Sequence, residues 1–291
     1  MIHLHVRLTE NLTKAGAPMK NSLYDHGFRK VWNELFVYSS KGYITSVLDF
    51  HEHDFYEVNL VLSGNIRVLF PDRFSEHTES CIVLTRPGTP HFISCHPDTL
   101  YSRLYLCFTH EFVSDFALET RQLLNLFGNS GAVILLSEAQ REEIRQLILQ
   151  IDQEENRLRQ KLLIFFLLSR LQDLAGSDPH SYKGVPPYII DSLTYIEEYY
   201  TEKITAEELA RKVNIGRTTL MTGFKRYTGS TLNDYLVNLR LRVAIQLMRD
   251  GKNVQEAAEW SGFGDSSSFI RSFKKAFGTT PRQYLQTRRE L

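Results

Sequence analysis

GFGDSSSFIRSFKKAFGTTPRQY, residues 262–284, decides the fold of the C-terminal region because much of it repeats an earlier stretch. FKRYTGSTLNDYL (224–236) aligns without a gap with FKKAFGTTPRQYL (273–285), at an offset of 49 residues. Upstream, TAEELARKVNIGRTTL resembles VQEAAEWSGFGDSSSF, with one extra residue in the second copy. Self-similarity at this period predicts two copies of one helical subdomain.

Each copy carries the signals of a helix-turn-helix. In the first, Thr205 and Glu208 form a capping box, a turn follows at 214–216, and a second helix runs from Arg217 to about Tyr227. In the second, the same roles fall to Asn253, Glu256, the turn 262–264 and the N-cap Asp265, with the helix ending near Phe277. One long amphipathic helix is expected to join the copies through Leu236, Leu239, Val243, Leu247 and Met248.

Double-stranded DNA is the partner that these units predict. A helix-turn-helix places the start of its second helix in the major groove, where hydroxyl and arginine side chains meet base edges. The candidates for base contacts are Arg217, Thr218, Thr219, Thr222, Ser266, Ser267, Ser268, Ile270 and Arg271. The candidates for phosphate contacts are Lys225, Arg226, Lys274 and Lys275. In the alternative interpretation, Ser266 and Ser267 only extend the cap and Lys274 is merely solvated.

The charge distribution agrees with this division of labour. The chain has no net charge, yet its last 81 residues hold 15 basic and 6 acidic groups, whereas all ten histidines lie at or before His180. A basic C-terminal part beside a neutral or acidic one is typical of a polyanion-binding module joined to a separate domain.

The N-terminal part has a different periodicity. Short β-rich runs between about 43 and 108 are spaced as in an antiparallel barrel or sandwich. After His110 the period becomes helical, and QKLLIFFLLSRL is apolar nearly all round. The expected organisation is a β-barrel over 1–110, helices over 111–175 that pack on the barrel or form a dimer, a Gly-, Pro- and Ser-rich linker over 176–187, and the double helix-turn-helix over 188–291.

The region from about 188 to 288 resembles the DNA-binding domain of the AraC/XylS-type bacterial transcription regulators. Matches to the family signature include Gly262, Phe263, Asp265, Ser267, Phe269, Arg271, Phe273, Lys274, Gly278, Thr280, Pro281 and Tyr284. The chain departs from the family pattern at Ser268, Leu285, Gly216, Thr222 and Gly223. Gly223 falls in the middle of an expected helix, where a glycine costs about 1 kcal/mol relative to alanine. The resemblance implies a sequence-specific regulator that binds successive major grooves and contacts RNA polymerase. The departures predict that the first unit is the less selective reader.

Two histidines and a glutamate in HEHDFYEVNLVLSG (51–64) resemble the first motif of a cupin barrel, and PGTPH (87–91) resembles the second. In cupin enzymes such a set, here His51, His53, Glu57 and His91, binds a divalent metal. The AraC/XylS family commonly keeps a degenerate form of this barrel as a sensor domain without a catalytic metal. We therefore expect these residues to line a ligand-binding site, and we expect no cofactor and no enzymatic activity. The alternative is a metal-dependent cupin enzyme that acts on a sugar, with a helical appendage.

The expected effector is a sugar or a related small molecule, because aromatic faces beside hydrogen-bonding groups suit a polyhydroxylated ligand. The candidate lining residues are His51, His53, Tyr56, Glu57, Arg67, His91, Tyr101, Arg103 and Tyr105, although Tyr101 and Tyr105 can instead only pack the barrel wall. Residues 1–30 are either an arm over this site or an edge strand. Effector binding would alter how a homodimer holds DNA, and the expected output is activation.

Composition places the protein among ordinary cytoplasmic proteins. No apolar run exceeds the seven residues 162–168, and the N-terminus has no apolar signal-peptide region. Cys81, Cys95 and Cys107 form an odd set without a C-x-x-C spacing, which predicts free thiols in a reducing compartment.

Overall fold

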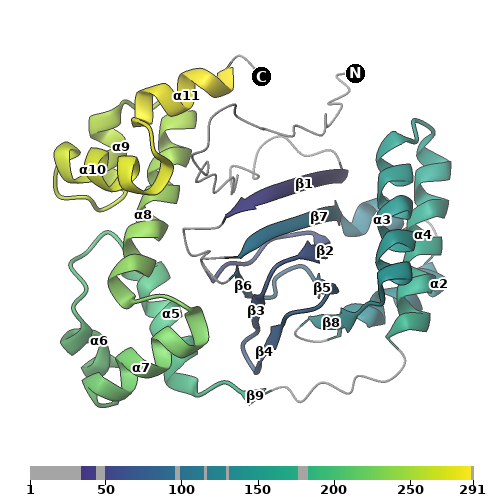
Figure 1. The fold of residues 1–291 in the computed structure, drawn as a ribbon, viewed down its shortest axis with the longest axis horizontal. Helices are drawn as coiled ribbons and strands as arrows, with labels where there is room; N and C mark the ends of the chain where they lie inside the picture. Colours follow the sequence, from purple (N-terminus) through teal and green to yellow (C-terminus); the bar gives the residue numbers. More distant parts are fainter. Residues whose placement is uncertain are drawn as a thin grey trace.

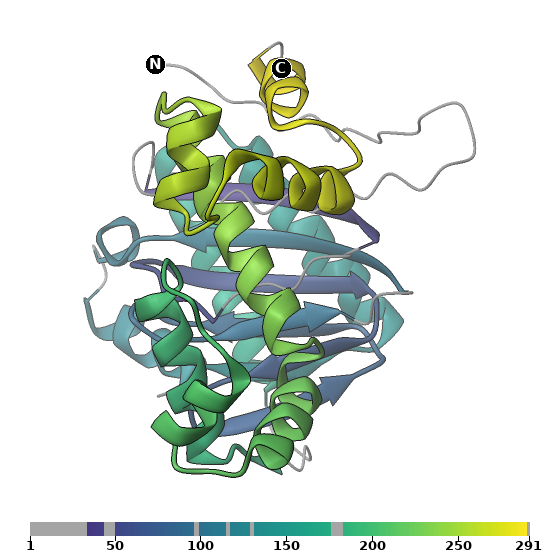
Figure 2. The same cartoon turned by 90° about the vertical axis from the view of Figure 1, so that its left-hand side faces the viewer.

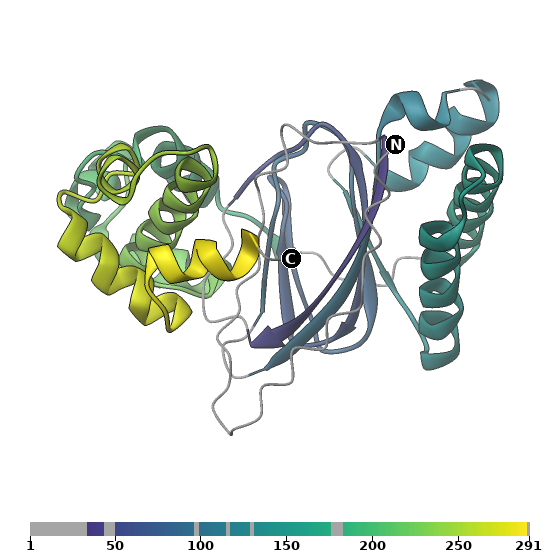
Figure 3. The same ribbon diagram turned by 90° about the horizontal axis from the view of Figure 1, so that it is seen from above.

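The computed structural model describes residues 34–289 except 44–49, 96–98, 115–116, 129–130 and 176–182. The described chain forms three parts side by side, with the β-strands in the middle, one group of helices on one side and the C-terminal helices on the other (Figures 1 and 3). None of the described helices is long and apolar enough to span a membrane. The expected order of an all-β and an all-α domain is confirmed.

Two antiparallel sheets make up the N-terminal domain. The first has the order β1-β7-β2-β5-β8, formed by Leu35–Tyr43, Leu100–Phe108, Tyr56–Ser63, Cys81–Thr85 and Ala132–Leu135. The second has the order β6-β3-β4-β9, formed by Phe92–Cys95, Ile66–Leu69, Arg73–His77 and Lys183–Gly184. Among the described residues the strands thus form two sheets and not one closed barrel.

Helices cover the outer face of the first sheet. They are α1 (His110–Val113), α2 (Ala117–Leu124), the short 3-10 helix η1 (Asn125–Phe127), α3 (Glu138–Gln153) and α4 (Arg157–Leu174). The expected Ser137–Gln140 capping box begins α3. Alternate residues of the strands, such as Val58, Leu60, Leu104 and Leu106, pack here against Ile144, Ile148, Ile164, Leu167 and Leu171. The opposite face of this sheet therefore points towards the second sheet.

Two boundaries differ from the sequence prediction. The segment 111–175, expected to be helical, also supplies β8, which pairs with β5. The end of the segment expected to be a linker forms β9, which pairs with Arg73 and Phe74 of β4, while residues 176–182 lie outside the described residues. The C-terminal domain is therefore joined to the second sheet by backbone hydrogen bonds.

Seven helices of the described chain form the C-terminal domain. They are α5 (Pro187–Tyr199), α6 (Ala206–Lys212), α7 (Arg217–Thr228), α8 (Leu232–Arg249), α9 (Val254–Trp260), α10 (Ser266–Phe277) and α11 (Pro281–Arg289). The capping boxes expected at Thr205 and Asn253 are both present. Helix α8 crosses in front of the strands in the view of Figure 2 and carries one helix-turn-helix near each end.

Candidate DNA-binding and effector-binding sites

Helix α7 presents the base-contact candidates of the first unit. Arg217, Thr218, Thr219 and Thr222 are all exposed, so none is needed for the core of the unit. Arg217 forms an ion pair with Glu207, at 2.6 Å between Nε and Oε1, with both side chains more than half exposed. Because an exposed pair of this kind is worth at most about 1 kcal/mol, Arg217 can exchange Glu207 for DNA at little cost.

Helix α10 presents the corresponding residues of the second unit. Ser267 and Arg271 are exposed, whereas Ile270 is partly buried against the core of that unit. The Asp265 carboxylate accepts hydrogen bonds from the backbone N–H and the hydroxyl of Ser268, both at 2.8 Å. The hydroxyl of Ser268 therefore serves the N-cap and also accepts a hydrogen bond from Nη2 of Arg271 at 3.3 Å, whereas Ser267 and the rest of the exposed Arg271 guanidinium remain as candidates for reading bases.

The basic residues at the ends of the two recognition helices are also exposed. Lys225, Arg226, Lys274 and Lys275 lie in the last turns of α7 and α10. Each helix then ends at a glycine in the left-handed conformation, Gly229 in one unit and Gly278 in the other. The repeat thus gives both units the same arrangement of basic groups beside the helix end.

Gly223 has a packing role that the sequence did not reveal. A Cβ atom at this position of α7 would overlap the hydroxyl of Tyr188 on α5. The glycine permits α5 and α7 to approach closely, so its cost in helix propensity is offset by this contact. Gly223 therefore no longer supports the prediction of a looser first unit, which now rests on the N-cap Gly216, without a side-chain cap hydrogen bond, and on Thr222.

The second candidate site lies on the inner face of the first sheet. Burial of the alternate strand residues places Glu57 and Asn59 of β2 beside Tyr101, Arg103 and Tyr105 of β7. The guanidinium of Arg103 lies 4.7 Å from the ring centroid of Tyr101 and 4.5 Å from that of Tyr105, so two rings hold it. Its Nη1 also donates to the Tyr101 hydroxyl at 3.3 Å. Burial lowers the pKa of Arg103 to about 10, which leaves it charged at neutral pH.

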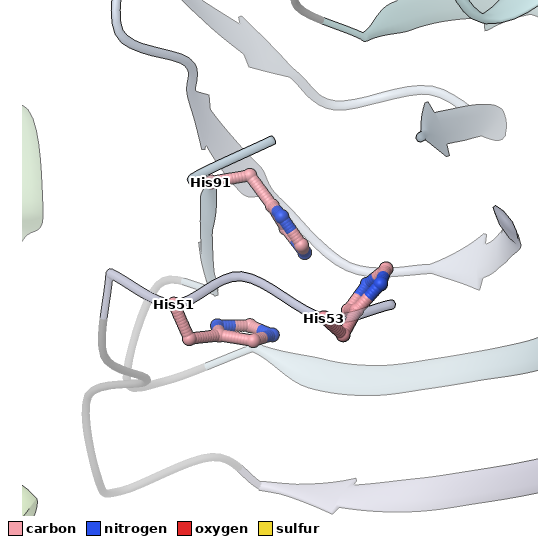
Figure 4. A group of neighbouring side chains, drawn as sticks. All are labelled: His51, His53 and His91. Carbon is pink, nitrogen blue, oxygen red and sulfur yellow. The ribbon is translucent and has the colours of Figure 1, made fainter. Parts of the chain in front are cut away.

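Three histidines form a cluster beside this face. Rings of His51, His53 and His91 point towards one another (Figure 4), and one nitrogen from each lies within 4.8 Å of the others. His51 and His91 belong to one isolated β-bridge. Burial lowers the pKa of His51 to about 4 and that of His91 well below its usual value, so both are neutral at pH 7.

The cluster could hold a divalent metal ion through three imidazole nitrogens, since neutral imidazole is a good ligand for such ions. The Nδ1 atom of His91 lies 2.9 Å from the Thr89 carbonyl oxygen, which would leave Nε2 for a metal. Glu57 is not among these three residues, although its carboxylate lies 3.3 Å from Nε2 of His53. The residues thus fit three ligands of the cupin-type set.

Two of the residues predicted to line the effector site do not point to the inner face of the sheets. Tyr56 points to the helical side of the sheet, where its ring stacks on Phe108 and contacts Phe127. Arg67 points to the outer side of the second sheet and bonds Glu76 at 2.7 Å between Nε and Oε1. The side-chain alternation of strands sets these directions, and the sequence did not show which face would be the inner one.

The first helix-turn-helix contacts the outer face of the second sheet directly. Tyr227 of α7 packs edge-to-face on Phe74 of β4, with ring centroids 5.1 Å apart. Tyr235 of α8 accepts a hydrogen bond from the backbone N–H of Phe50 at 2.6 Å and donates to Glu197 at 3.1 Å. Because Phe50 precedes His51, one residue joins the histidine cluster to the DNA-binding domain.

Comparisons with known proteins match both domains of the chain. Residues 35–168 match the AraC-like ligand binding domain, and residues 209–287 match a helix-turn-helix domain. The HTH-type transcriptional activators RhaS of Enterobacter sp. (strain 638) and of Shigella sonnei (strain Ss046) are each 26% identical to this chain, over 251 and 258 residues, and each alignment covers 82% of this chain and 87% of the relative. ToxT from Vibrio cholerae, a solved structure, is 14% identical over 87% of this chain and 98% of its own, with a TM-score of 0.39.

The fold and the two sites define a DNA-binding regulator with an effector-binding domain. The chain has the two domains of an AraC-type transcription regulator, an AraC-like ligand-binding domain followed by a helix-turn-helix domain. The two relatives named above are transcriptional activators and not enzymes, which contradicts the alternative that this chain is a metal-dependent cupin enzyme.

Proposed function

We propose that the protein is a homodimeric activator of carbohydrate-related genes that binds a sugar-type effector on the inner face of the first sheet. Its two helix-turn-helix units would read successive major-groove segments of a promoter in the cytoplasm, and its DNA-bound form would contact RNA polymerase. The observation that carries this proposal is the pairing of two exposed recognition helices with a buried polar group in the neighbouring domain.

The DNA-binding part can be tested in the full chain on a duplex selected from a random pool. Arg217→Ala and Arg271→Ala are each expected to weaken binding by about 1–3 kcal/mol and to relax the preferred sequence. Lys225→Ala and Lys274→Ala should each weaken binding to all duplexes alike. Each should also reduce the slope of the logarithm of the binding constant against the logarithm of the salt concentration by about one. Arg145→Ala on α3 is the matched control, because this arginine is in the N-terminal domain. Unchanged binding by both arginine variants would refute the assignment.

The dimer part rests on helix α4. Leu158, Leu162 and Phe166 are 58%, 52% and 52% exposed, and their spacing of four places them on one face of the helix. An apolar stripe of this kind suits an isologous contact with the same helix of a second copy. The helix, expected to be buried against the barrel or against a second subunit, is therefore open on one side in the single chain.

Sedimentation of the full chain tests the dimer. Leu162→Glu is expected to shift the protein from dimer to monomer and to weaken binding to a two-site promoter while leaving the fold intact. Gln172→Glu, an exposed polar position of the same helix, is the control. A wild type that sediments as a monomer at micromolar concentration would contradict this part of the proposal.

A further inference from the structure

A buried amide without a partner lies at the centre of the first sheet. Asn59 belongs to β2, the middle strand of the order β1-β7-β2-β5-β8. It is 0% exposed, and neither its amide nitrogen nor its amide oxygen has a hydrogen-bond partner among the described residues. Asparagine is disfavoured in strands, and a buried amide without partners lowers stability further. A residue that destabilises the fold in both ways indicates a role other than stability.

The strand pairs show which neighbours Asn59 has on the inner face. It lies directly across from Tyr105 of β7 on one side and from Val83 of β5 on the other. Its neighbour on the same strand and face is Glu57, whose carboxylate lies 3.3 Å from Nε2 of His53. None of these side chains bonds the Asn59 amide. The amide therefore points away from its own sheet, into the space between the two sheets.

The second sheet also turns polar groups towards this space. Phe74 of β4 contacts Tyr227 on the outer face, so the alternation of the strand places Ser75 and His77 on the inner face. Both are buried, and Nε2 of His77 lies 2.8 Å from the Ser75 hydroxyl. Among the described residues no strand of one sheet pairs with a strand of the other, so the sheets can separate slightly around a ligand without breaking a backbone ladder.

A primary amide indicates which chemical group it would bind. Its oxygen accepts and its nitrogen donates, side by side in one plane. Two hydroxyl groups on adjacent carbons match this pair, because one donates to Oδ1 while the other accepts from Nδ2, with both bonds close to linear. A single hydroxyl that served both atoms would have to bend both bonds. Sugars carry such adjacent hydroxyl pairs around their rings.

We propose that Asn59 recognises the effector by binding two adjacent hydroxyl groups of a sugar, one through each polar atom of its amide. This inference rests on the proposed effector-binding function and deepens it, because it names both the part of the sugar that is read and the residue that reads it. A sugar that lacks either hydroxyl leaves a donor or an acceptor of the amide buried and unpaired, so the site discriminates strongly against it. The sequence motifs, which pointed to the histidines and to Glu57, did not indicate Asn59.

The first test measures sugar binding to the full-length protein by calorimetry. The panel is glucose, galactose, mannose, fucose, rhamnose, arabinose, xylose and ribose, followed by the monodeoxy analogues of the sugar that binds most tightly. Two adjacent positions are expected to be decisive, and the loss of either hydroxyl should weaken binding by about 10-fold or more. In Asn59→Leu the same two losses should change binding by less than about 2-fold, as a double-mutant cycle requires when the contact is absent. Melting in up to molar sugar keeps weak binding measurable.

Leu60→Val is the matched control, because Leu60 lies on the opposite face of the same strand and is 0% exposed. This variant should melt at a lower temperature and keep the wild-type pattern of decisive hydroxyls. Binding that depends on no adjacent pair, or a pair that is equally decisive in Asn59→Leu, overturns this inference and leaves the sensor function standing. A wild type that binds no sugar of the panel contradicts the proposed function itself, and this inference with it.

The second test separates a binding role of Asn59 from a structural one. Asn59→Leu has nearly the same shape and removes the unpartnered amide, so the ligand-free protein is expected to melt at the same or a higher temperature. A lowered melting temperature would show that the amide is already satisfied in the ligand-free protein, as by a buried water molecule, and would overturn the binding role.

Discussion

The two helix-turn-helix units come from one repeated sequence, yet the first packs on a β-sheet and the second forms a core of its own. The first shares a core with the second sheet, in which Phe224, Tyr227 and Tyr235 join Phe74 and Phe92. The second has its own core, which contains no strand residue among those described. At the position where the first unit has Tyr227, the second has Ala276. The difference teaches that a repeat specifies the fold of each unit, whereas single large residues specify what the unit docks on.

This asymmetry makes the first unit the natural receiver of the effector signal. The second sheet contacts α7 directly, whereas in the described part of the chain α10 is linked to the first unit through α8 and through the contact of Gly262 with the end of α5. A ligand can shift DNA binding only if it favours one of two arrangements, and the shared core is where two such arrangements would differ.

The largest effect is expected from equivalent core substitutions. Phe224→Ala and Phe273→Ala occupy matching positions of the repeat, both are 0% exposed, and each should lower stability by about 3–5 kcal/mol. Hydrogen exchange should show lost protection in β3, β4 and α7 for Phe224→Ala, but only beyond residue 240 for Phe273→Ala. Lost protection in the sheets of the Phe273 variant would show that the two cores are not independent.

Gly223→Ala is expected to destabilise the first unit by about 1–3 kcal/mol through overpacking, although alanine is usually better than glycine in a helix. The new Cβ would overlap the hydroxyl of Tyr188. Thermal melting measures the change. The control is the same substitution in a Tyr188→Phe background, where the loss should shrink or reverse. Stabilisation in the wild-type background would contradict the close packing of α5 on α7.

Tyr235→Phe should cost about 1–3 kcal/mol, because the buried N–H of Phe50 loses its acceptor. It should also weaken the effect of ligand on DNA binding, since this bond joins the segment before His51 to α8. Tyr284→Phe, the equivalent position in the second unit, is the control and should leave that effect unchanged. The measurement is DNA affinity with and without effector, and an unaltered ratio in Tyr235→Phe would remove this bond from the signalling path.

A further expected effect depends on pH. Burial raises the pKa of Glu197 to about 8 from 4.5, so between these values the folded protein holds a proton that the unfolded chain has released. Its contribution to the free energy of unfolding is therefore present at low pH and is lost as the pH rises through this window. Glu197→Gln should match the wild type near pH 4.5 and become the more stable protein towards pH 8. Parallel stability curves would mean that Glu197 titrates normally.

Most of the C-terminal fold could be predicted because its signals are local. The capping residues Thr205, Asn253 and Asp265 and the repeat itself indicate helix boundaries without any knowledge of the partner surface. Strands such as β5 and β6 were also apparent from their β-branched and apolar runs. In contrast, β4 (RFSEH) is short and polar, and β8 is a four-residue run within helical sequence, so neither carries a clear periodicity.

The sites were predicted unequally for the same reason. The exposed residues of α7 and α10 follow from helix position alone, whereas Tyr56, Arg67 and Asn59 depend on which face of a strand points inward. Asn59 lies in the alternating pattern two residues beyond Glu57, and that spacing was the available signal. The docking of Tyr227 on Phe74 joins residues 153 positions apart, which no local pattern could reveal.

The length of helix α8 also constrains the spacing between the two DNA subsites of a promoter. Its 18 residues form a rod of about 27 Å, since an α-helix rises 1.5 Å per residue. This length is close to one turn of B-DNA, about 34 Å, and a rod cannot stretch to follow a displaced subsite. Inserting half a helical turn of base pairs between the two subsites of a promoter would rotate one of them to the far side of the duplex. Promoters under this regulator are therefore expected to tolerate base changes more readily than changes in spacing.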